Sequence, residues 1–505
     1  MFKSVLIANR GEIAVRIIRT CKLLGIGTVA IYSDADADAL HVRLADRAVR
    51  IGSADPGDSY LNIEKIVRTA VEAGVDAVHP GYGFVSENWN LAAGLEDAGI
   101  VFVGPSPRTL TIAGNKIDCK RIAKRAGVPV IEGSGSVIFD PEEARQTARK
   151  MGYPVLLKSA FGGGGRGIRE AANDGELLEN FRTASSETRR SLGRVGLFIE
   201  KLIRPARHIE VQILSDGKGK TIQLGERECS IQRRRQKLVE MAPAPGLTEE
   251  DRKRAGDYAV SLIRGLDFKN ASTVEFLMDG EKNFYFIEVN SRLQVEHGVT
   301  EVVAGVDLVK EQLEIAAGEG IGYSQKDVVL SGAAIECRIN AEDPCAGFYP
   351  SAGRIEQLFF PGGADVRIDT ALYPGYEVPE YYDSLIAKLI TSGRSLDEAR
   401  RRMVLALDEL RIDGLKTTIP LHKLLMTNQH FSSWDLDTSF MEKHRIVECL
   451  IEKLAEERAA LAERGAVLAA TLLELNASGR ALSSQQGARQ AVGTEPEATR
   501  FYDAV

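Results

Sequence analysis

The first 114 residues alternate short apolar runs with amphipathic stretches. The apolar runs predict strands at residues 5–8, 28–32, 77–78 and 101–103. Apolar positions recur at helical spacing in residues 13–24 and 63–73, which predicts helices. Strands that alternate with helices favour a parallel, doubly wound sheet. We therefore expect an N-terminal Rossmann-like α/β domain.

The pattern changes after residue 114. A helix is predicted at residues 116–126, and a strand at 155–158 runs into a glycine cluster. Further strands are predicted at residues 210–214, 273–278 and 284–289. From about residue 206 helix and strand patterns are mixed, which favours antiparallel sheet.

A third pattern occupies the end of the chain. Apolar residues recur every seven positions at Val447, Leu454, Leu461, Leu468 and Leu475, which predicts a helix. Residues 476–505 are polar, and Gly479, Gly487, Gly493 and Pro496 oppose regular structure there. We expect a helical and then polar extension over residues 446–505.

Composition indicates a soluble globular protein. Hydrophobic residues make up 44% and charged residues 27% of the 505 residues. No stretch approaches the roughly 18 apolar residues that a membrane span needs. The six cysteines are scattered without metal-ligand spacing, so we expect reduced thiols in a cytoplasm and no zinc.

The net charge of −7 argues against a general nucleic-acid binder. The basic run Arg233-Arg234-Arg235-Gln236-Lys237 therefore serves a smaller anion or forms a solvated face. Asp34, after the second predicted strand, invites a nicotinamide-dehydrogenase interpretation. The first turn, residues 9–12, lacks the G-x-G-x-x-G pattern that a dinucleotide needs, which disfavours that interpretation.

Residues 287–297 hold the most informative chemistry. Directly after a buried strand, this segment presents Glu288, Asn290, Arg292 and Glu296, which can serve a metal, an anion and a proton transfer. If residues 279–282 close a hairpin, Glu275 faces Phe286, and Glu288 lies on the same face as Glu275. Two such carboxylates predict a divalent cation; pairing with nearby arginines is the alternative.

A phosphate site is predicted around residue 160. The cluster Gly162, Gly163, Gly164 and Gly165 lets backbone N–H groups fold over phosphates as a mobile lid, unless it is a plain flexible linker. Lys158 and Lys116 supply cations that phosphate charge requires. Residues 198–203 are typical of a strand that runs into a connector, where an adenine could hydrogen-bond to exposed backbone and to Glu200 or Lys201.

At this point the chain up to about residue 445 resembles the biotin carboxylases of the ATP-grasp superfamily. The segments that carry the resemblance are His79-Pro80-Gly81-Tyr82-Gly83-Phe84-Val85-Ser86-Glu87-Asn88, Glu228-Cys229-Ser230-Ile231-Gln232-Arg233-Arg234, Asn290-x-Arg292-x-Gln294-Val295-Glu296-His297, Glu336-Cys337-Arg338-Ile339-Asn340-Ala341-Glu342-Asp343-Pro344 and Tyr381-Tyr382-Asp383-Ser384. The resemblance implies a biotin carboxylase N-terminal domain at 1–114, an ATP-grasp domain at 115–330 with a lid at about 131–204, and a mixed α+β C-terminal domain at 331–445.

The resemblance also implies the reaction. Bicarbonate attacks the γ-phosphate of ATP to give carboxyphosphate, which delivers carbon dioxide to a biotin nitrogen. By the same resemblance, ATP is held by Lys116, Lys158, Gly162 to Gly165, Glu200, Lys201, Leu202, Ile203, His208 and Gln232. Mg²⁺ or Mn²⁺ is bound by Glu275, Glu288 and Asn290, and bicarbonate by Lys237, Arg292, Gln294 and the backbone of Val295. Glu296 is the expected base, and Arg338 stabilises the biotin enolate.

Two positions depart from the family pattern. Arg235 stands where the family commonly has a histidine, which puts that nucleotide contact in doubt, although a guanidinium can still meet a phosphate or ribose. Gly298 replaces the usual proline after His297, and we expect a looser turn there.

Partners follow from what the sequence lacks. No Met-Lys-Met segment is present, so biotin is expected on a separate biotin carboxyl carrier protein, alongside a carboxyltransferase subunit. We expect a cytoplasmic homodimer that binds neither nucleic acid nor membrane. The parent complex is an acetyl- or propionyl-CoA carboxylase, or a two-subunit pyruvate or 2-oxoglutarate carboxylase.

Other interpretations remain open. One is another ATP-grasp ligase, which would need neither Arg338 nor the segment 79–88; another is a non-catalytic regulatory or scaffold subunit. The extension 446–505 either packs on its own body or docks the carrier or transferase subunit.

Overall fold

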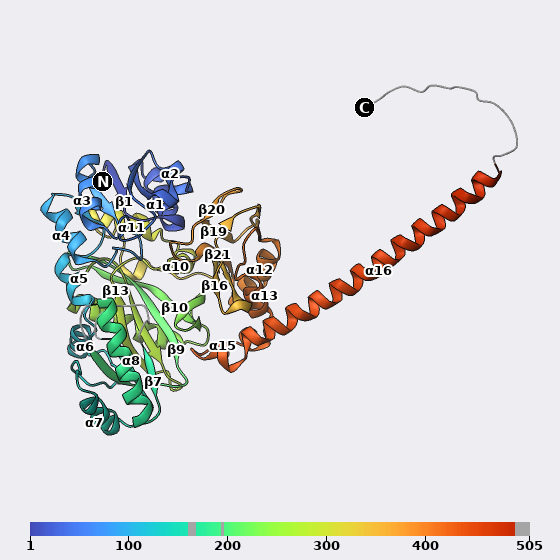
Figure 1. Cartoon of the computed structure of the whole chain (residues 1–505). Coiled ribbons are helices and arrows are strands. Elements are labelled where there is room, and N and C mark those ends of the chain that lie inside the picture. Colours follow the sequence, from blue (N-terminus) through green and yellow to red (C-terminus); the bar gives the residue numbers. More distant parts are fainter. Residues whose placement is uncertain (160–167, 193–195, 490–505) are drawn as a thin grey trace. The chain divides into compact units, whose positions relative to one another are not determined.

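The computed structural model describes residues 1–159, 168–192 and 196–489 (Figure 1). The chain divides into two compact units, Met1–Ile446 and Val447–Val505. Among the described residues, no helix is both long enough and apolar enough to cross a bilayer.

The N-terminal sheet is parallel, with strand order β3-β2-β1-β4-β5. Its strands are β1 (Ser4–Ile7), β2 (Gly27–Ser33), β3 (Arg47–Gly52), β4 (Ala77–His79) and β5 (Val101–Phe102). The helices are α1 (Gly11–Leu23), α2 (Leu40–Leu44), α3 (Ile63–Ala73), α4 (Trp89–Asp97) and α5 (Pro107–Ala113). The doubly wound prediction is confirmed. Among the strands of this sheet it missed the edge strand β3, whose first four residues are exposed or half-buried.

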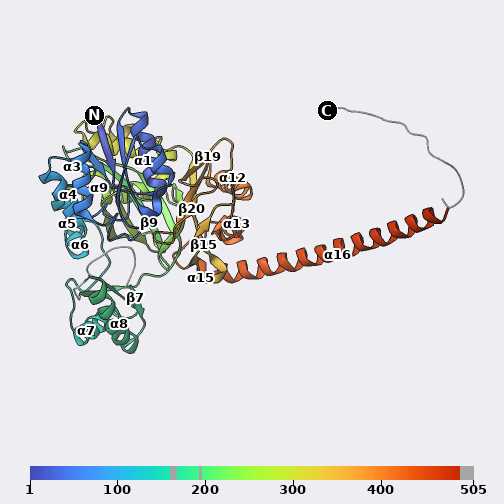
Figure 2. The ribbon, with the colours of Figure 1, turned by 45° about the horizontal axis from the view of Figure 1, so that its top comes forward.

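A small lobe follows. After α6 (Lys116–Arg125), a three-stranded antiparallel sheet in the order β7-β6-β8 is formed by β6 (Val155–Ser159), β7 (Arg169–Ala171) and β8 (Leu197–Lys201). The helices α7 (Pro141–Met151) and α8 (Asp174–Leu192) pack with it, and Figure 2 shows this group projecting as a lobe. Its own core includes Leu157, Phe181 and Ile199, so the lobe is a separately packed element.

The largest sheet has eight antiparallel strands in the order β13-β12-β9-β10-β11-β14-β21-β19. They are β9 (Arg207–Asp216), β10 (Thr221–Arg233), β11 (Gln236–Ala242), β12 (Lys269–Met278), β13 (Phe284–Asn290), β14 (Ala333–Asn340), β19 (Val366–Thr370) and β21 (Leu385–Gly393). Helix α9 (Glu249–Gly265) buries Leu262 and Ile263 in one core with Phe276 and Phe286 of this sheet. The predicted antiparallel sheet is confirmed, and it carries most of the site.

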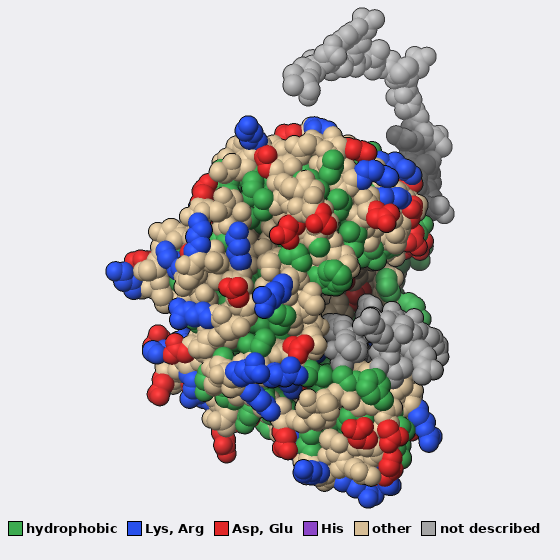
Figure 3. Space-filling view, turned by 90° about the vertical axis from the view of Figure 1, so that its left-hand side faces the viewer, with side chains coloured by type: hydrophobic (Ala, Val, Ile, Leu, Met, Phe, Trp, Pro, Cys, Tyr) green, Lys and Arg blue, Asp and Glu red, His purple; other side chains and the backbone are tan. Residues whose placement is uncertain are grey.

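Shorter elements complete the first unit. The helices are α10 (His297–Ala304), α11 (Leu308–Ala316), α12 (Leu396–Glu409), α13 (Ile419–Thr427), α14 (Gln429–Ser432) and α15 (Phe440–Lys443). Three two-stranded sheets pair β15 (Glu342–Asp343) with β16 (Tyr349–Pro350), β17 (Gly353–Arg354) with β20 (Glu377–Val378), and β18 (Gln357–Phe359) with β22 (Arg411–Asp413). On the face in Figure 3, acidic and basic side chains are interspersed with small apolar patches.

The final helix, α16 (Ile446–Arg489), begins where the heptad pattern predicts. It runs through Gly479 and Gly487, so the expectation of irregular structure from residue 476 was wrong as far as Arg489. Side chains at 451–473 are exposed, apart from the half-buried Leu454.

Candidate active site

Two carboxylates face each other across the β12–β13 hairpin. Glu275 and Glu288 are Cα partners, and a register shift after Glu275 pairs Phe276 with Phe286. The expectation that Glu275 faces Phe286 was therefore wrong by one position, because the sequence does not reveal a bulge. The bulge places the two acids directly opposite each other.

The carboxylate pair has the donors of a divalent-cation site. Asn290 Nδ2 lies 2.9 Å from Glu275 Oε1, which brings an amide into the set. The Lys116 ammonium lies 2.8 Å from Glu288 Oε2, and His208 Nε2 lies 3.1 Å from Glu275 Oε2. The carboxylates of Glu275 and Glu288 are therefore paired with lysines and a histidine. Among the described residues they are not paired with arginines, as the alternative interpretation of the sequence required. Hard oxygen ligands fit Mg²⁺ or Mn²⁺.

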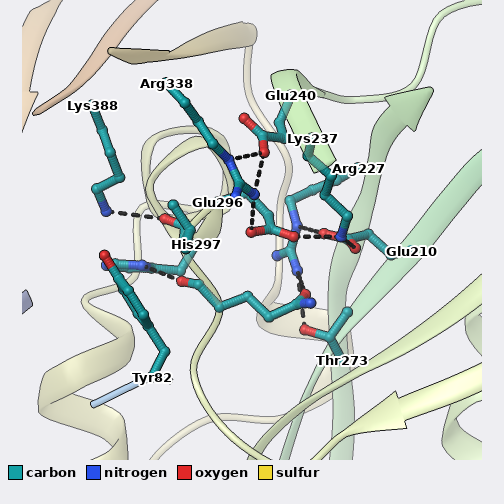
Figure 4. Close-up of polar contacts among 12 residues, drawn as sticks. Tyr82, Glu210, Arg227, Lys237, Glu240, Thr273, Glu296, His297, Arg338 and Lys388 are labelled. Atoms are coloured by element: carbon teal, nitrogen blue, oxygen red, sulfur yellow. Dashed lines mark hydrogen bonds and ion pairs between the residues drawn. The ribbon is translucent and has the colours of Figure 1, made fainter. Parts of the chain in front are cut away.

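Lys237 connects this pair to the predicted base. Its ammonium lies 2.5 Å from Glu210 and 2.5 Å from Glu296 (Figure 4). It also lies 3.1 Å from Glu275. Burial disfavours the charge, but these carboxylates outweigh burial and raise the pKa of Lys237 well above its usual value. Lys237 is therefore a fixed cation.

Glu296 is held ionised. It is 1% exposed and precedes α10, and burial alone would favour its protonation. Lys237, Arg338 and Arg227 overcome burial and lower the pKa of Glu296 well below its usual value. Glu296 is therefore ionised near neutral pH, which is the form that a general base needs.

Arg338 on β14 bridges two carboxylates. Its Nε donates to Glu240 Oε1 at 2.6 Å, and its Nη2 donates to Glu296 Oε2 at 2.8 Å (Figure 4). Burial raises the pKa of Glu240 to about 7 despite the opposing effect of Arg338. Figure 4 shows Arg338 and Lys237 approaching Glu296 from different strands.

Arg227 was missed by the sequence analysis. This guanidinium is fully buried on β10 and donates to Glu210 at 2.5 Å and to the Gln294 side-chain oxygen at 2.9 Å. It also reaches Gln212, Thr273 and Thr300. Arg227 thus orients groups around Lys237. The signal was available, because residues 226–228 place three consecutive charges between the apolar residues Leu224 and Ile231.

The predicted anion-binding residues are brought together. Arg292 Nη2 donates to Asn290 Oδ1 at 3.1 Å, and Arg292 Nε lies 3.3 Å from Glu87. Gln294 Nε2 donates to Glu275 at 3.1 Å. The Val295 carbonyl accepts a hydrogen bond from Lys388 at 3.0 Å, so this backbone is anchored.

The predicted nucleotide residues are only partly described. Gly162, Gly163, Gly164 and Gly165 lie outside the described residues. Lys158 and Lys120 both pair with the Glu200 carboxylate. Burial, together with Lys120 and Lys116, lowers the pKa of Lys158 well below its usual value. Lys158 is therefore placed where added negative charge would stabilise its protonated form.

The segment after Glu200 differs from expectation. The Lys201 N–H donates to the Glu132 carbonyl at 2.9 Å, and the Leu202 N–H donates to the Pro154 carbonyl at 3.3 Å. These two donors are not exposed backbone, since the lobe uses them itself. Lys201 Nζ donates to the Gly152 carbonyl at 2.8 Å, and Ile203 follows the end of β8.

The β10–β11 hairpin presents the remaining candidates. Gln232 pairs in register with Lys237. Arg235 lies in the tight turn with a φ of 66° and donates to the Ile168 carbonyl at 3.2 Å. Its guanidinium lies 3.9 Å from Glu170 on β7. Arg235 therefore reaches the lobe.

Gly298 lies in the first turn of α10, not in a loose turn. A Cβ built there would clash with Ile390 Cδ1 and lie 3.0 Å from Glu336 Oε2. Residues of β21 and β14 therefore leave no room for a side chain at this position.

Family models match three consecutive parts of the chain. Residues 1–110 match the biotin carboxylase N-terminal domain, residues 115–323 the ATP-binding domain of the carbamoyl-phosphate synthase L chain, and residues 336–443 the biotin carboxylase C-terminal domain.

Individual relatives of the chain are carboxylase subunits, in agreement with these family models. The chain is 49% identical over 448 residues to biotin carboxylase 1 of Bacillus subtilis, covering 88% of this chain and 100% of that protein. It is 50% identical over 444 residues to the 2-oxoglutarate carboxylase small subunit of Hydrogenobacter thermophilus, covering 88% and 94%. It is 46% identical over 465 residues to a pyruvate carboxylase subunit of Methanothermobacter thermautotrophicus, covering 92% and 94%.

A solved structure shows the same fold. The biotin carboxylase domain dimer of Hydrogenobacter thermophilus 2-oxoglutarate carboxylase, crystallised with MgADP, ADP and bicarbonate, superposes with a TM-score of 0.87. It is 49% identical and covers 88% of this chain and 98% of that one.

Proposed function

The chain belongs to the biotin carboxylase family, and we propose that it carboxylates biotin on a separate carrier protein, using ATP and bicarbonate. The observation that carries this proposal is one buried carboxylate, Glu296, held between Lys237 and Arg338. An ionised base next to two fixed cations suits a reaction in which anionic substrates meet. The cations attract bicarbonate while the base accepts its proton.

Bicarbonate activation is the first step. Arg292, Gln294, Lys237 and the Val295 backbone hold bicarbonate beside Glu296. Glu296 removes the proton of bicarbonate, which turns a weak nucleophile into one able to attack the γ-phosphate of ATP. Arg227 acts through its neighbours, because it fixes Glu210 and the Gln294 side chain.

Biotin activation is the second step. Arg338 stabilises negative charge on the ureido oxygen of biotin, so that the neighbouring nitrogen gives its proton to the phosphate released from carboxyphosphate and attacks carbon dioxide. In the present arrangement its Nε and Nη2 are taken up by Glu240 and Glu296. We infer that protonation of Glu296 by bicarbonate weakens its hold on Arg338 and so couples the two steps.

The cofactor and nucleotide sites are assigned by the same resemblance. Glu275, Glu288 and Asn290 would hold Mg²⁺ or Mn²⁺, which would offset the negative charge of the nucleotide phosphates. ATP is assigned to Lys116, Lys158, Gly162 to Gly165, Glu200, Lys201, Leu202, Ile203, His208 and Gln232.

Arg235 acts differently from a direct nucleotide ligand. Its contacts with Ile168 and Glu170 tie the β10–β11 hairpin to the lobe at residues 131–204. This lobe serves as the lid. Replacement Arg235→Ala should raise the KM for ATP while the rate at saturating ATP falls less; an unchanged KM would contradict this role.

The biological setting is a multi-subunit carboxylase. Its partners are a biotin carboxyl carrier protein and a carboxyltransferase subunit, and the chain acts as a cytoplasmic homodimer. The dimer of the Hydrogenobacter domain supports self-association. Relatives from pyruvate and 2-oxoglutarate carboxylases support either of these two acceptors, and an acyl-CoA is the alternative acceptor.

Phosphate release tests the function. With ATP, Mg²⁺ and bicarbonate, free biotin should increase phosphate release by the chain alone. ATP hydrolysis at the same rate with and without biotin would indicate another ATP-grasp ligase. No ATP hydrolysis would indicate a non-catalytic scaffold subunit.

A further inference from the structure

Two histidines of the chain meet at the surface. All seven histidines lie in the described ranges, and the five buried ones are His41, His79, His208, His297 and His422. The other two, exposed His430 on α14 and half-buried His444 after α15, stack with ring centroids 3.9 Å apart and planes 18° apart. These two imidazoles are not used by the carboxylation site.

A carboxylate completes the group. One ligand atom each from His430, Asp435 and His444 can be chosen so that all three lie within 4.8 Å of one another. Ligand atoms around a tetrahedral zinc ion are about 3.3 Å apart, given Zn–N distances of about 2.0–2.1 Å. To share one ion, the three side chains must bring these atoms closer together, and the two imidazole rings must turn out of their stack, because an imidazole binds a metal in the plane of its ring.

The surrounding structure fixes the backbone of the ligands. Asn428 caps α14 by accepting a hydrogen bond from the His430 N–H at 2.8 Å. The Asp435 N–H donates to the His430 carbonyl at 3.3 Å. The His444 ring packs on buried Phe440 with centroids 4.7 Å apart. Backbone hydrogen bonds and ring packing thus hold the three candidate ligands in place.

The local charge suits a cation. Lys443 Nζ lies 3.3 Å from Asp435 and 3.4 Å from Asp437, so an ammonium already neutralises this acidic surface. A divalent ion can replace it at Asp435 while Lys443 keeps Asp437.

We propose that His430, Asp435 and His444 form a surface site for Zn²⁺ or a similar borderline ion such as Co²⁺ or Ni²⁺, with water completing the coordination. Two imidazoles and one carboxylate favour these ions over Mg²⁺, which prefers oxygen ligands. The bound ion clips residues 430–444 together. Because α15 packs beside β10 and the Thr438 N–H donates to the Ala206 carbonyl at 2.9 Å, the clip stabilises this attachment (Figure 1).

Zinc binding to the metal-free full-length protein tests the site. The background is Cys345→Ser with Cys449→Ser, because both thiols are exposed, and saturating MgADP occupies the carboxylation site. Zinc is titrated in competition with a chromogenic chelator. Asp435→Asn and His444→Gln should each weaken zinc binding at least tenfold, whereas the control Glu442→Gln should not. Equal zinc affinity in all three proteins would overturn the proposal.

A second measurement guards against misfolding. Zinc should raise the Tm of the Glu442→Gln protein and leave that of the surface variant His430→Asn unchanged. His430→Cys, which restores a zinc ligand, should recover the shift. The proposal fails if zinc shifts the Tm of His430→Asn and of the control equally.

Discussion

Arg338 Nη2 donates to Glu296 Oε2 at 2.8 Å, so the group assigned to biotin holds the group assigned to bicarbonate. The two residues come from β14 and from the turn before α10. Their contact gives one physical link between two half-sites. The effect of a substitution at either residue should therefore be measured in both partial reactions.

Removing the base should stop bicarbonate activation. Glu296→Gln keeps the shape of the side chain but cannot accept the proton, and general-base catalysis is worth roughly 10²–10⁴-fold. We expect kcat for phosphate release to fall by about that factor. Steady-state kinetics at saturating ATP and bicarbonate measure it, with Glu442→Gln as the control. A kcat within a factor of about three of the control would refute the role of Glu296 as the base.

Removing the guanidinium should separate the two steps. Arg338→Gln should lower biotin-dependent turnover by roughly 10²–10³-fold, the usual effect of losing an oxyanion donor. Phosphate release without biotin should persist, because the bicarbonate groups remain. Parallel assays with and without biotin check this split. Equal losses in both assays would show that Arg338 acts only through Glu296.

Glu240 should make stability depend on pH. Burial raises its pKa from the usual 4.5 to about 7, so the folded protein binds more protons at this group than the unfolded chain. Its contribution to stability is present below pH 4.5 and is lost as the pH rises to about 7. Relative to wild type, Glu240→Gln should therefore gain Tm progressively across this window. Parallel Tm curves would contradict the assignment.

Gly298 should not tolerate a side chain. Gly298→Ala places a methyl group against Ile390 and Glu336, and overpacking of this kind costs about 1–3 kcal/mol. Denaturant unfolding should show this loss. Ile390→Val removes the clashing Cδ1 atom, so the double variant should regain part of the stability. Additive losses would show that Ile390 is not the obstacle.

Much of the fold was predictable because burial imposes periodicity. The apolar runs around Phe276 and Phe286 identify the hairpin, and their spacing places Glu275 and Glu288 on it. The bulge that sets them opposite each other leaves no such signal. The edge strand β3 was missed since its residues are largely exposed.

Contacts between distant segments were the least predictable part of the site. The sequence segments that resemble a family point to Arg338 and Glu296, but the Glu240 contact depends on the pairing of β11 with β14. Likewise, no ligand spacing marks His430 and His444, because two short helices bring them together. These contacts depend on how distant segments pack in the folded chain, which the local sequence pattern does not reveal.

Formation of carboxybiotin from labelled bicarbonate tests the central claim most directly. The purified chain is incubated with ATP, Mg²⁺, free biotin and labelled bicarbonate, and acid-labile label on biotin is compared with phosphate released. We predict label on biotin that requires ATP and is abolished by both Glu296→Gln and Arg338→Gln. ATP turnover by the wild-type chain without any labelled biotin would contradict the claim.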